Sequence, residues 1–321
     1  MKEVSSLLGY RESIKVMDAT LRDGGLVNDF NFTDEFVKKI YKANIECGVD
    51  YMEMGYRASK KVFDESKFGK WKFCSDDHIR EIVGDNDTDL KIAIMADIGR
   101  HDKGDFDQKA NSPVDMIRVA AYIHQMPEAI DMIEDAAKKG YETTCNIMAI
   151  SNTQENDLKA ALDMLGKSPV DVIYIVDSFG AIYPEEMARV VDLYSEFTAK
   201  YNKQLGIHAH NNQQLAFANT IEACGDGVNW LDATYNGMGR GAGNCSMELL
   251  LGFLKNPKYN VYPAFKFIED NMVKLKEDGI VWGYDLQYLI TGLLNQHPRT
   301  AIQFTKDKRT DYAEYYKDML I

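Results

Sequence analysis

Short apolar segments alternate with longer amphipathic segments along most of the chain. Strands that are buried on both faces show as continuous apolar runs, whereas amphipathic helices repeat their apolar positions every three to four residues. On this basis we predict eight strands, at residues 14–18, 51–54, 90–95, 116–119, 143–148, 172–176, 205–210 and 230–234. Helices are predicted between most of them, at residues 33–47, 127–139, 154–165, 184–201 and 213–224, but none between the third and fourth strands.

The alternation of strand and helix predicts the fold class. Eight strands, each normally followed by a helix, indicate a (β/α)8 TIM barrel, an α/β fold. The alternative is a doubly wound open sheet, but the dinucleotide-binding loop of such a sheet is not found. After Pro257 the repeat stops, and helices are predicted at 264–277 and 284–295. We therefore expect a barrel domain over residues 1–257 and a short, mostly helical C-terminal extension over residues 258–321.

Composition and charge narrow the function classes. The chain of 321 residues carries a formal net charge of -13, which disfavours nucleic acid and anionic membranes because both need a basic face. Its five cysteines lack C-x-x-C spacing, which is typical of reduced thiols. There is no apolar run long enough to span a bilayer and no signal-peptide core at the N-terminus. We expect a soluble cytoplasmic protein that binds neither nucleic acid nor membrane.

The predicted seventh strand ends in His208-Ala209-His210-Asn211. Side chains two residues apart on a strand point to the same face, so both imidazoles are expected to converge. A lone pair of histidines is a weak signal, since most histidines are ordinary core or surface residues. Two imidazoles and a carboxylate, however, bind a divalent metal and leave coordination positions open for a substrate. The segment from Asp18 to Gly25, after the first strand, offers that carboxylate.

Polar residues scattered through the sequence are expected to meet at one site, because the carboxyl ends of barrel strands form a single mouth. They are Arg22, Asp23, Glu53, Asp97, Arg118, Asn146, Asp177, His208 and His210. A glycine-rich loop over residues 236–244 follows the eighth strand, without the G-x-G-x-x-G spacing of a dinucleotide fingerprint. We interpret it as a phosphate-binding or substrate-closing loop, or as a tight turn.

Three motifs, in this order along the chain, resemble a known family. Residues 18–25, Asp-Ala-Thr-Leu-Arg-Asp-Gly-Gly, resemble the D-x-T-L-R-D-G signature of the HMG-CoA lyase-like (DRE-TIM metallolyase) superfamily. Residues 208–212 are similar to its metal-binding H-x-H-N, and residues 237–244 to its G-x-G-x-x-A-G-N. The resemblance covers residues 14–255, and the glycine-rich segment is most similar to the 4-hydroxy-2-oxovalerate aldolase branch.

The resemblance implies a divalent metal ion, Mn²⁺ or Mg²⁺, held by Asp23, His208 and His210. Asn244 corresponds to a residue that is a further ligand in some members of the family. The ion would polarise the ketone of a bidentate 2-oxo acid and stabilise the pyruvate enolate formed when a carbon–carbon bond breaks or forms. Arg22 would add a fixed positive charge beside the enolate oxygen.

Arg22 also has a structural interpretation, as the ion-pair partner of Glu53 or Asp177. Substrate contacts and catalytic groups are expected around the same mouth. The residues assigned to substrate are Arg22, Arg118, Asn146, Asp177 and Gly241, and those assigned to catalysis are Arg22, Glu53 and Tyr288.

Leu26 departs from the aldolase pattern. Aldolases of this branch carry a histidine at this place, which resembles a general base for the substrate hydroxyl, and leucine cannot accept a proton. Either the base is another group, or the aldol substrate differs from that of the family type. Candidates for the base are a metal-bound water, Glu53 and Tyr288, together with His297 if the extension folds over the mouth.

Three functions stay open on these grounds. The first is a metal-dependent carbon–carbon lyase (aldolase) for a 4-hydroxy-2-oxo acid. The second is an acyl- or aldol-transferase that condenses a 2-oxo acid with an acceptor, and the third is a catalytically altered barrel that has lost its base. The expected partners are a small-molecule 2-oxo acid, a second copy of the chain in a homo-oligomer and, from the resemblance, an aldehyde-consuming enzyme.

Overall fold

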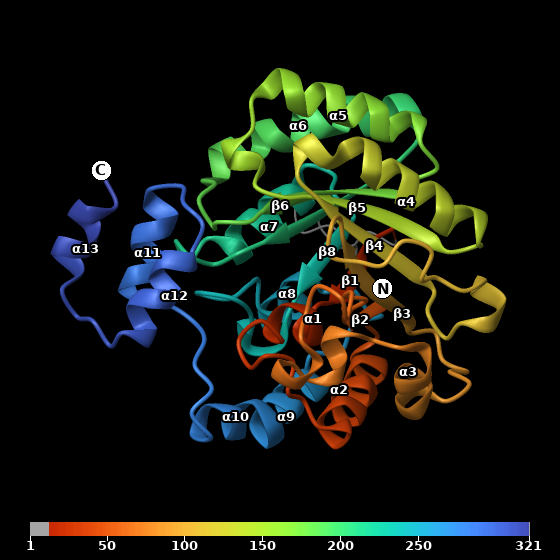
Figure 1. Cartoon of the computed structure of the whole chain (residues 1–321), viewed down its shortest axis with the longest axis horizontal. Coiled ribbons are helices and arrows are strands. Elements are labelled where there is room, and N and C mark those ends of the chain that lie inside the picture. Colours follow the sequence, from red (N-terminus) through yellow and green to blue (C-terminus); the bar gives the residue numbers. More distant parts are fainter. Residues whose placement is uncertain (1–12, 321) are drawn as a thin grey trace.

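Eight parallel strands close into a barrel in the computed structural model, which describes residues 13–320 (Figure 1). The last strand is hydrogen-bonded to the first, so the sheet has no free edge. This closure confirms the predicted TIM barrel and excludes the open sheet. The strands are β1 (Lys15–Asp18), β2 (Tyr51–Tyr56), β3 (Lys91–Asp97), β4 (Met116–Ala121), β5 (Glu142–Ile147), β6 (Val172–Asp177), β7 (Gln204–Ala209) and β8 (Trp230–Ala233).

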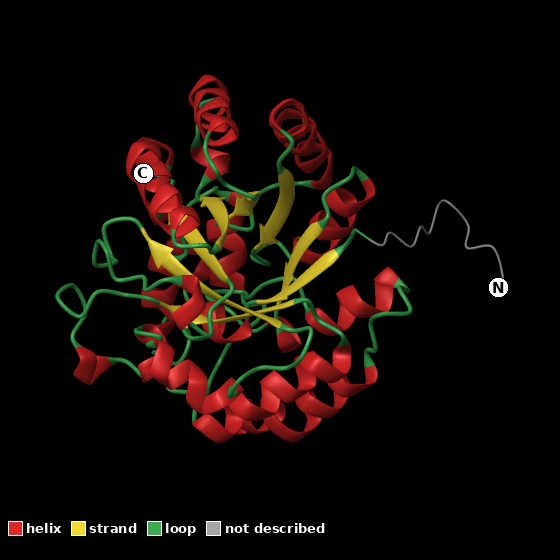
Figure 2. Cartoon of the chain, turned by 90° about the vertical axis from the view of Figure 1, so that its right-hand side faces the viewer, coloured by secondary structure: helices red, strands yellow, loops and turns green. Residues whose placement is uncertain are grey.

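Helices surround the strands on the outside of the barrel (Figure 2). They are α2 (Asp34–Cys47), α3 (Asp76–Val83), α4 (Met126–Lys138), α5 (Glu155–Lys167), α6 (Pro184–Tyr201), α7 (Ala216–Gly225) and α8 (Met247–Leu254). The Thr33 side chain caps α2 by accepting from the backbone N–H of Phe36. Helix α7 begins later than predicted because Gln214 has a left-handed backbone, with φ of 61°. Between β3 and β4 there is only a 3-10 turn, Lys109–Asn111, in agreement with the prediction.

A short helix that the pattern did not predict, α1 (Thr20–Gly24), follows β1 directly. Five residues are too few to show a helical repeat. The Asp18 carboxylate fixes this turn by accepting from the backbone N–H of Thr20 at 2.9 Å and from Nδ2 of Asn44 at 2.8 Å. The D-x-T part of the motif therefore builds the turn that carries Arg22 and Asp23 to the mouth.

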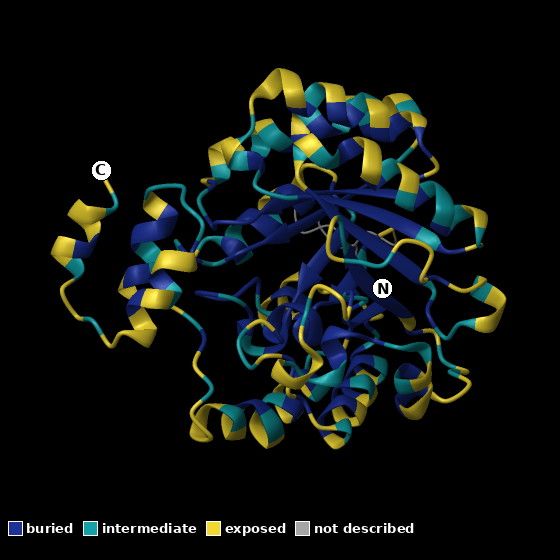
Figure 3. Cartoon of the chain, in the orientation of Figure 1, coloured by how far each residue is buried: buried dark blue, intermediate teal, exposed yellow. Residues whose placement is uncertain are grey.

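The strands are buried along most of their length (Figure 3), and apolar side chains pack on both sides of the sheet. The larger core lies between the strands and the surrounding helices, with residues such as Leu162 and Ile207 fully buried. A smaller cluster forms a separate layer around Met17, Tyr51 and Tyr174. Because their backbones are held by the closed sheet, the polar side chains at the strand ends stand on a rigid base.

The C-terminal extension consists of two parts that pack differently. The segment with α9 (Tyr262–Phe267), a π-helical turn (Ile268–Met272) and α10 (Val273–Glu277) joins the main core, where Phe267 contacts Phe36 of α2. The remaining helices, α11 (Leu286–Leu293), α12 (Arg299–Lys306) and α13 (Tyr312–Asp318), lie to one side of the barrel (Figure 1). They share a small core of their own, formed by Ile290, Phe304 and Tyr315.

The packing therefore changes near residue 285, some way beyond the predicted boundary at residue 257. Trp282 still belongs to the main core, whereas Ile290 belongs to the small one. None of the helices in residues 13–320 combines the length and apolar character needed to cross a membrane.

Candidate metal centre

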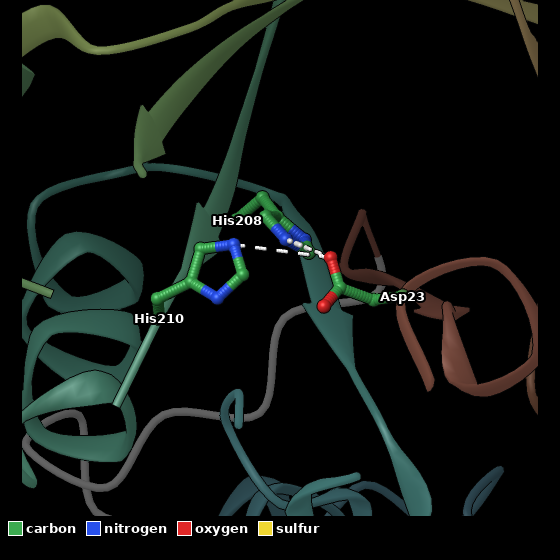
Figure 4. A group of neighbouring side chains, drawn as sticks. All are labelled: Asp23, His208 and His210. Carbon is green, nitrogen blue, oxygen red and sulfur yellow. Dashed lines mark ion pairs between the residues drawn. The ribbon is translucent and has the colours of Figure 1, made fainter. Parts of the chain in front are cut away.

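Three side chains from two strand ends converge at the barrel mouth (Figure 4). Asp23 lies in α1, and His208 and His210 lie at the end of β7. The Nε2 atoms of His208 and His210 are 3.5 Å and 3.8 Å from Oδ2 of Asp23, and all three residues are buried. The two imidazoles thus share one face, as the alternation of side chains along a strand predicts.

The spacing of these atoms fits a divalent ion. Nitrogen and oxygen ligands bind such ions at about 2.0–2.2 Å, which places neighbouring ligand atoms roughly 3 Å apart. The potential ligand atoms of the cluster all lie within 4.8 Å of one another. A mixed set of one carboxylate and two imidazoles leaves further coordination positions open and does not select a single metal.

The protonation states of Asp23 and His210 suit metal binding, whereas hydrogen bonds with Asp23 and Asp232 outweigh burial and raise the pKa of His208, so a metal must displace a proton there. Burial disfavours the charged form of Asp23, but the charge of Arg22 and the hydrogen bond with His208 help to hold the pKa of this carboxyl well below its usual range. Burial lowers the pKa of His210 well below its ordinary value, against the attraction of Asp23. An ionised carboxylate and a neutral imidazole are the forms that bind metal.

Asn244 lies beside the cluster, where the loop after β8 forms an isolated bridge with His210. Its amide nitrogen donates to the carbonyl of Met238 at 3.3 Å. Its Oδ1 atom is buried and has no hydrogen-bond partner among the described residues. Buried polar atoms normally have a partner, so this oxygen is available as a further metal ligand.

Asp232 in β8 orients His208. Its Oδ2 lies 2.9 Å from Nδ1 of His208, so a proton on Nδ1 leaves the lone pair of Nε2 facing Asp23. Sequence reasoning missed Asp232. The signal was a single carboxylate within the apolar strand from Trp230 to Ala233, where an unpaired charge would be costly.

A chain of buried ion pairs connects this carboxylate to the other side of the cluster. Arg118 donates to Asp232 at 2.6 Å and to Oε2 of Glu53 at 2.8 Å. The same Glu53 oxygen accepts from Nε of Arg22 at 2.8 Å, and Nη1 of Arg22 contacts Oδ2 of Asp23. Arg22 is therefore a structural partner of Glu53 and, at the same time, lies against the candidate metal ligand.

Asp177, the last residue of β6, binds backbone groups, whereas the ion pairs of Arg22 are with Asp23 and Glu53. The Asp177 carboxylate accepts from the backbone N–H groups of Ala181 at 3.0 Å and Ile182 at 3.3 Å. Burial raises the pKa of Asp177 to about 7. This side chain shapes the loop after β6.

A cavity of about 60 Å³ opens at the cluster. Of the predicted substrate residues, Arg22 and Asn146 line it, together with the three metal-cluster residues. The rest of the wall consists of small or apolar side chains, including Leu26, and of three polar ones, Tyr56, Asp97 and Arg240. Tyr56 was not expected here, because the second strand was predicted to end before it.

The other predicted site residues lie around the cavity without lining it. Glu53 and Arg118 form the fully buried layer of ion pairs described above. Gly241 and Tyr288 lie farther out, where a β-carbon at Gly241 would meet Cδ1 of Tyr288 at 3.5 Å. The φ of +67° at Gly241 favours glycine at this contact between the loop and the extension.

Arg240 connects the metal cluster, the barrel mouth and the extension. Its backbone N–H donates to Oδ1 of Asp23 at 3.0 Å, and its guanidinium donates to the carbonyl of Ser178 at 3.1 Å. Nη1 of Arg240 lies 3.2 Å from Nε2 of His297, which belongs to the extension. The extension therefore reaches the mouth, with one arginine side chain between His297 and the cavity.

The family comparison agrees with this geometry. The HMGL-like family model matches residues 13–269, which is most of the chain and includes the barrel and all three motifs. The chain belongs to the HMGL-like family. Its members are lyases, and the DRE-TIM aldolases among them depend on a divalent metal, for which this chain has a candidate site.

Relatives of this HMGL-like chain include proteins named as enzymes. It is 25% identical over 323 residues to a 4-hydroxy-2-oxovalerate aldolase of Bacillus cereus, with 96% of this chain and 92% of that protein covered. It is 29% identical over 250 residues to an oxaloacetate decarboxylase of Mycobacterium tuberculosis, with 77% and 71% covered.

Solved structures show the same architecture. The N-terminal domain of a Bacteroides vulgatus protein, thought to be an aldolase, superposes with a TM-score of 0.76 at 29% identity, covering 91% of this chain and 96% of that one. An HMG-CoA lyase of Bacillus subtilis gives a TM-score of 0.65 at 15% identity, covering 83% and 95%, a likeness of fold alone.

Proposed function

We propose that the chain is a divalent-metal-dependent aldolase that cleaves or forms a 4-hydroxy-2-oxo acid. The observation that carries this proposal is the position of Arg22, which contacts the same Asp23 oxygen that His208 and His210 face. An ion bound there, Mn²⁺ or Mg²⁺, supplies Lewis-acid polarisation of a ketone. The guanidinium lies ready to stabilise the oxygen on which negative charge develops when the carbon–carbon bond breaks.

The remaining residues have assigned roles in this proposal. Asn146 contacts the substrate from the cavity wall, and Arg240 attracts its carboxylate. Arg118 and Glu53 act through Arg22, which they hold in place. A longer substrate chain would extend toward Gly241 and Tyr288 at the outer rim.

Oxaloacetate decarboxylation is a second candidate. Two observations favour it, namely the Mycobacterium tuberculosis relative of that name and Leu26 in the cavity wall, where an aldolase base was expected. Loss of carbon dioxide from oxaloacetate produces the same pyruvate enolate as aldol cleavage. It requires no group to remove a hydroxyl proton, so the two candidates differ in one step.

A turnover assay tests the proposal. The purified chain is stripped with a chelator, reloaded with Mn²⁺ or Mg²⁺, and supplied with 4-hydroxy-2-oxo acids of increasing chain length. Release of the 2-oxo acid is expected only in the reloaded samples. His210→Ala is expected to abolish it, whereas His124→Ala, a change at an exposed histidine, serves as the matched control. Bound metal without turnover on any of these acids would refute the proposal.

Two further assays test for the decarboxylase and for the condensing transferase. Metal-dependent loss of carbon dioxide from oxaloacetate alone would favour the decarboxylase. Thiol release from an acyl-CoA in the presence of a 2-oxo acid would favour a condensing transferase. As partners we propose a small 2-oxo acid, a second copy of the chain in a homo-oligomer and an aldehyde-consuming enzyme.

A further inference from the structure

The cavity contains few groups that can accept a proton. Apart from the metal cluster, its lining includes four titratable side chains, those of Arg22, Arg240, Tyr56 and Asp97. Arginine stays protonated in proteins. Burial raises the pKa of Tyr56 well above its ordinary value, so the phenol also keeps its proton at neutral pH. Among the described residues of the cavity wall, the carboxylate of Asp97 is left as the acceptor.

Asp97 lies at the carboxyl end of β3, across the closed barrel from β7, whose end carries both histidines. Its Oδ2 is 3.5 Å from Nη1 of Arg100, whose side chain is more than half exposed. Its Oδ1 is buried and has no hydrogen-bond partner in the described part of the chain. A buried acceptor without a donor, in the wall of a substrate cavity, is suited to a hydroxyl group of the substrate.

The three side chains that the sequence offered as the general base are less accessible to a substrate in the cavity than Asp97. Glu53 is fully buried behind the cavity wall, and two arginines already donate to its Oε2 atom. Tyr288 lies outside the lining. His297 is separated from the cavity by Arg240, and its Nδ1 accepts from the backbone N–H of Arg299. Burial and the Arg240 guanidinium lower the pKa of His297 to about 4.

We propose that Asp97 is the catalytic base that accepts the substrate hydroxyl proton, in place of the histidine that Leu26 replaces. This inference rests on the proposed aldolase function. In cleavage, the C4 hydroxyl proton passes to the Asp97 carboxylate and the C4–O bond becomes a carbonyl. The C3–C4 bond breaks, and its electron pair forms the enolate of the 2-oxo acid. A proton from water completes the 2-oxo acid at C3, the carbonyl compound leaves, and Asp97 returns its proton to the solvent.

The groups around Asp97 set its strength as a base. Burial raises its pKa above the ordinary value, which favours proton uptake. The positive charges of Lys72, Arg100 and Arg22 oppose this effect and keep the carboxylate available. Tyr56 adds a neutral phenol on the same side. The carboxylate is thus a stronger base than an exposed one.

Lys72 acts through Asp97, because its positive charge lowers the pKa of that carboxyl. Its ammonium lies within a cage of aromatic rings, 4.3 Å from the centroid of Phe63, 4.4 Å from Tyr56 and 5.0 Å from Phe30. No carboxylate of the described residues lies within ion-pair distance of it. Cation–π contacts therefore hold a positive charge near Asp97 without neutralising that carboxylate.

The test compares two reactions in Asp97→Asn, both in the metal-loaded full chain. Cleavage of a 4-hydroxy-2-oxo acid needs the base and is expected to fall at least about 100-fold. Oxaloacetate decarboxylation forms the same enolate without a hydroxyl proton and is expected to stay within about threefold of wild type. Asp105→Asn, at an exposed carboxylate of the neighbouring loop, is the matched control. An equal fall in both reactions, or a fall in neither, would overturn the inference.

A second variant gives an independent readout. Lys72→Met removes a charge that lowers the pKa of Asp97, so the acidic limb of the cleavage pH profile is expected to move to higher pH. An unshifted limb would contradict the assignment. Assays of the wild-type chain distinguish failure of the proposed aldolase function from failure of the role assigned to Asp97. If it decarboxylates oxaloacetate but cleaves no hydroxy acid, the aldolase function itself is wrong, and Asp97 then has no hydroxyl to deprotonate.

Discussion

Asp232 and His208 come from neighbouring strands and are joined at 2.9 Å between Oδ2 and Nδ1. This contact fixes which imidazole nitrogen faces the cluster. Asp232→Asn is expected to weaken Mn²⁺ binding about 10- to 100-fold, because such outer-shell carboxylates keep the ligand histidine in the binding tautomer. Calorimetric titration measures the change, with the exposed Asp192→Asn as control. An unchanged Kd in Asp232→Asn would show that the contact does not orient the ligand.

Gly239 leaves space that the metal ligands need. A β-carbon at this position would lie 1.9 Å from Nδ2 of Asn244 and 2.7 Å from Oδ1 of Asp23. Gly239→Ala is therefore expected to weaken metal binding at least tenfold. Gly252→Ala is the control, since a β-carbon there meets nothing within 4 Å and alanine stabilises a helix by about 0.5–1 kcal/mol. Equal metal affinities in the two variants would contradict this account.

Arg22→Lys separates turnover from metal binding. Lysine cannot serve Glu53 and Asp23 together through the two arms of a guanidinium. We expect kcat to fall about 100-fold, as for the loss of one donor to a developing oxyanion. The Kd for Mn²⁺ is expected to change far less. Arg189→Lys, on the exposed face of α6, is the control, and an unchanged kcat in Arg22→Lys would refute the proposed role.

Asp18 predicts a pH dependence of stability. Burial raises its pKa to about 6 from 3.8, so the folded chain binds this proton more tightly than the unfolded chain. The free energy of unfolding should therefore decrease as the pH rises from about 4 to about 6, by up to about 3 kcal/mol from this group. Urea denaturation of the wild type and Asp18→Asn across this range measures the difference. Parallel pH profiles of the two proteins would exclude the effect.

The helices α11 to α13 should unfold apart from the barrel. Phe304 is 3% exposed and lies at the centre of their small core. Phe304→Ala is expected to cost about 3–5 kcal/mol locally and to speed amide hydrogen exchange in residues 286–319. Exchange in the strands should not change. Leu293→Ala, at a half-exposed position, is the control, and faster exchange throughout the barrel would argue for one cooperative unit.

Much of the architecture was predictable because the apolar runs report burial on both faces of a parallel strand. The convergence of His208 and His210 followed from the two-residue repeat of a strand, which needs no tertiary information. Helix α1 was not predictable in this way, since it is too short for a repeat and depends on the buried contact between Asp18 and Asn44.

The partners of buried charges could not be predicted either. The sequence places Asp232 in a strand but does not say which cation lies across the barrel interior. The pairing of Arg118 with both Asp232 and Glu53 depends on the closure of the sheet. The same holds for His297, which reaches Arg240 from 57 residues away only because the extension returns to the edge of the mouth.

The ion-pair layer under the mouth leaves an electrical imbalance. Three carboxylates, of Asp23, Glu53 and Asp232, face two guanidiniums, of Arg22 and Arg118, and the layer carries one unit of negative charge. A divalent ion at the candidate site would reverse this to one unit of positive charge, which would suit the singly charged 2-oxo acid of the proposed function. We therefore expect the cation to bind before the organic acid, and anionic inhibitors to bind more tightly to the metallated protein.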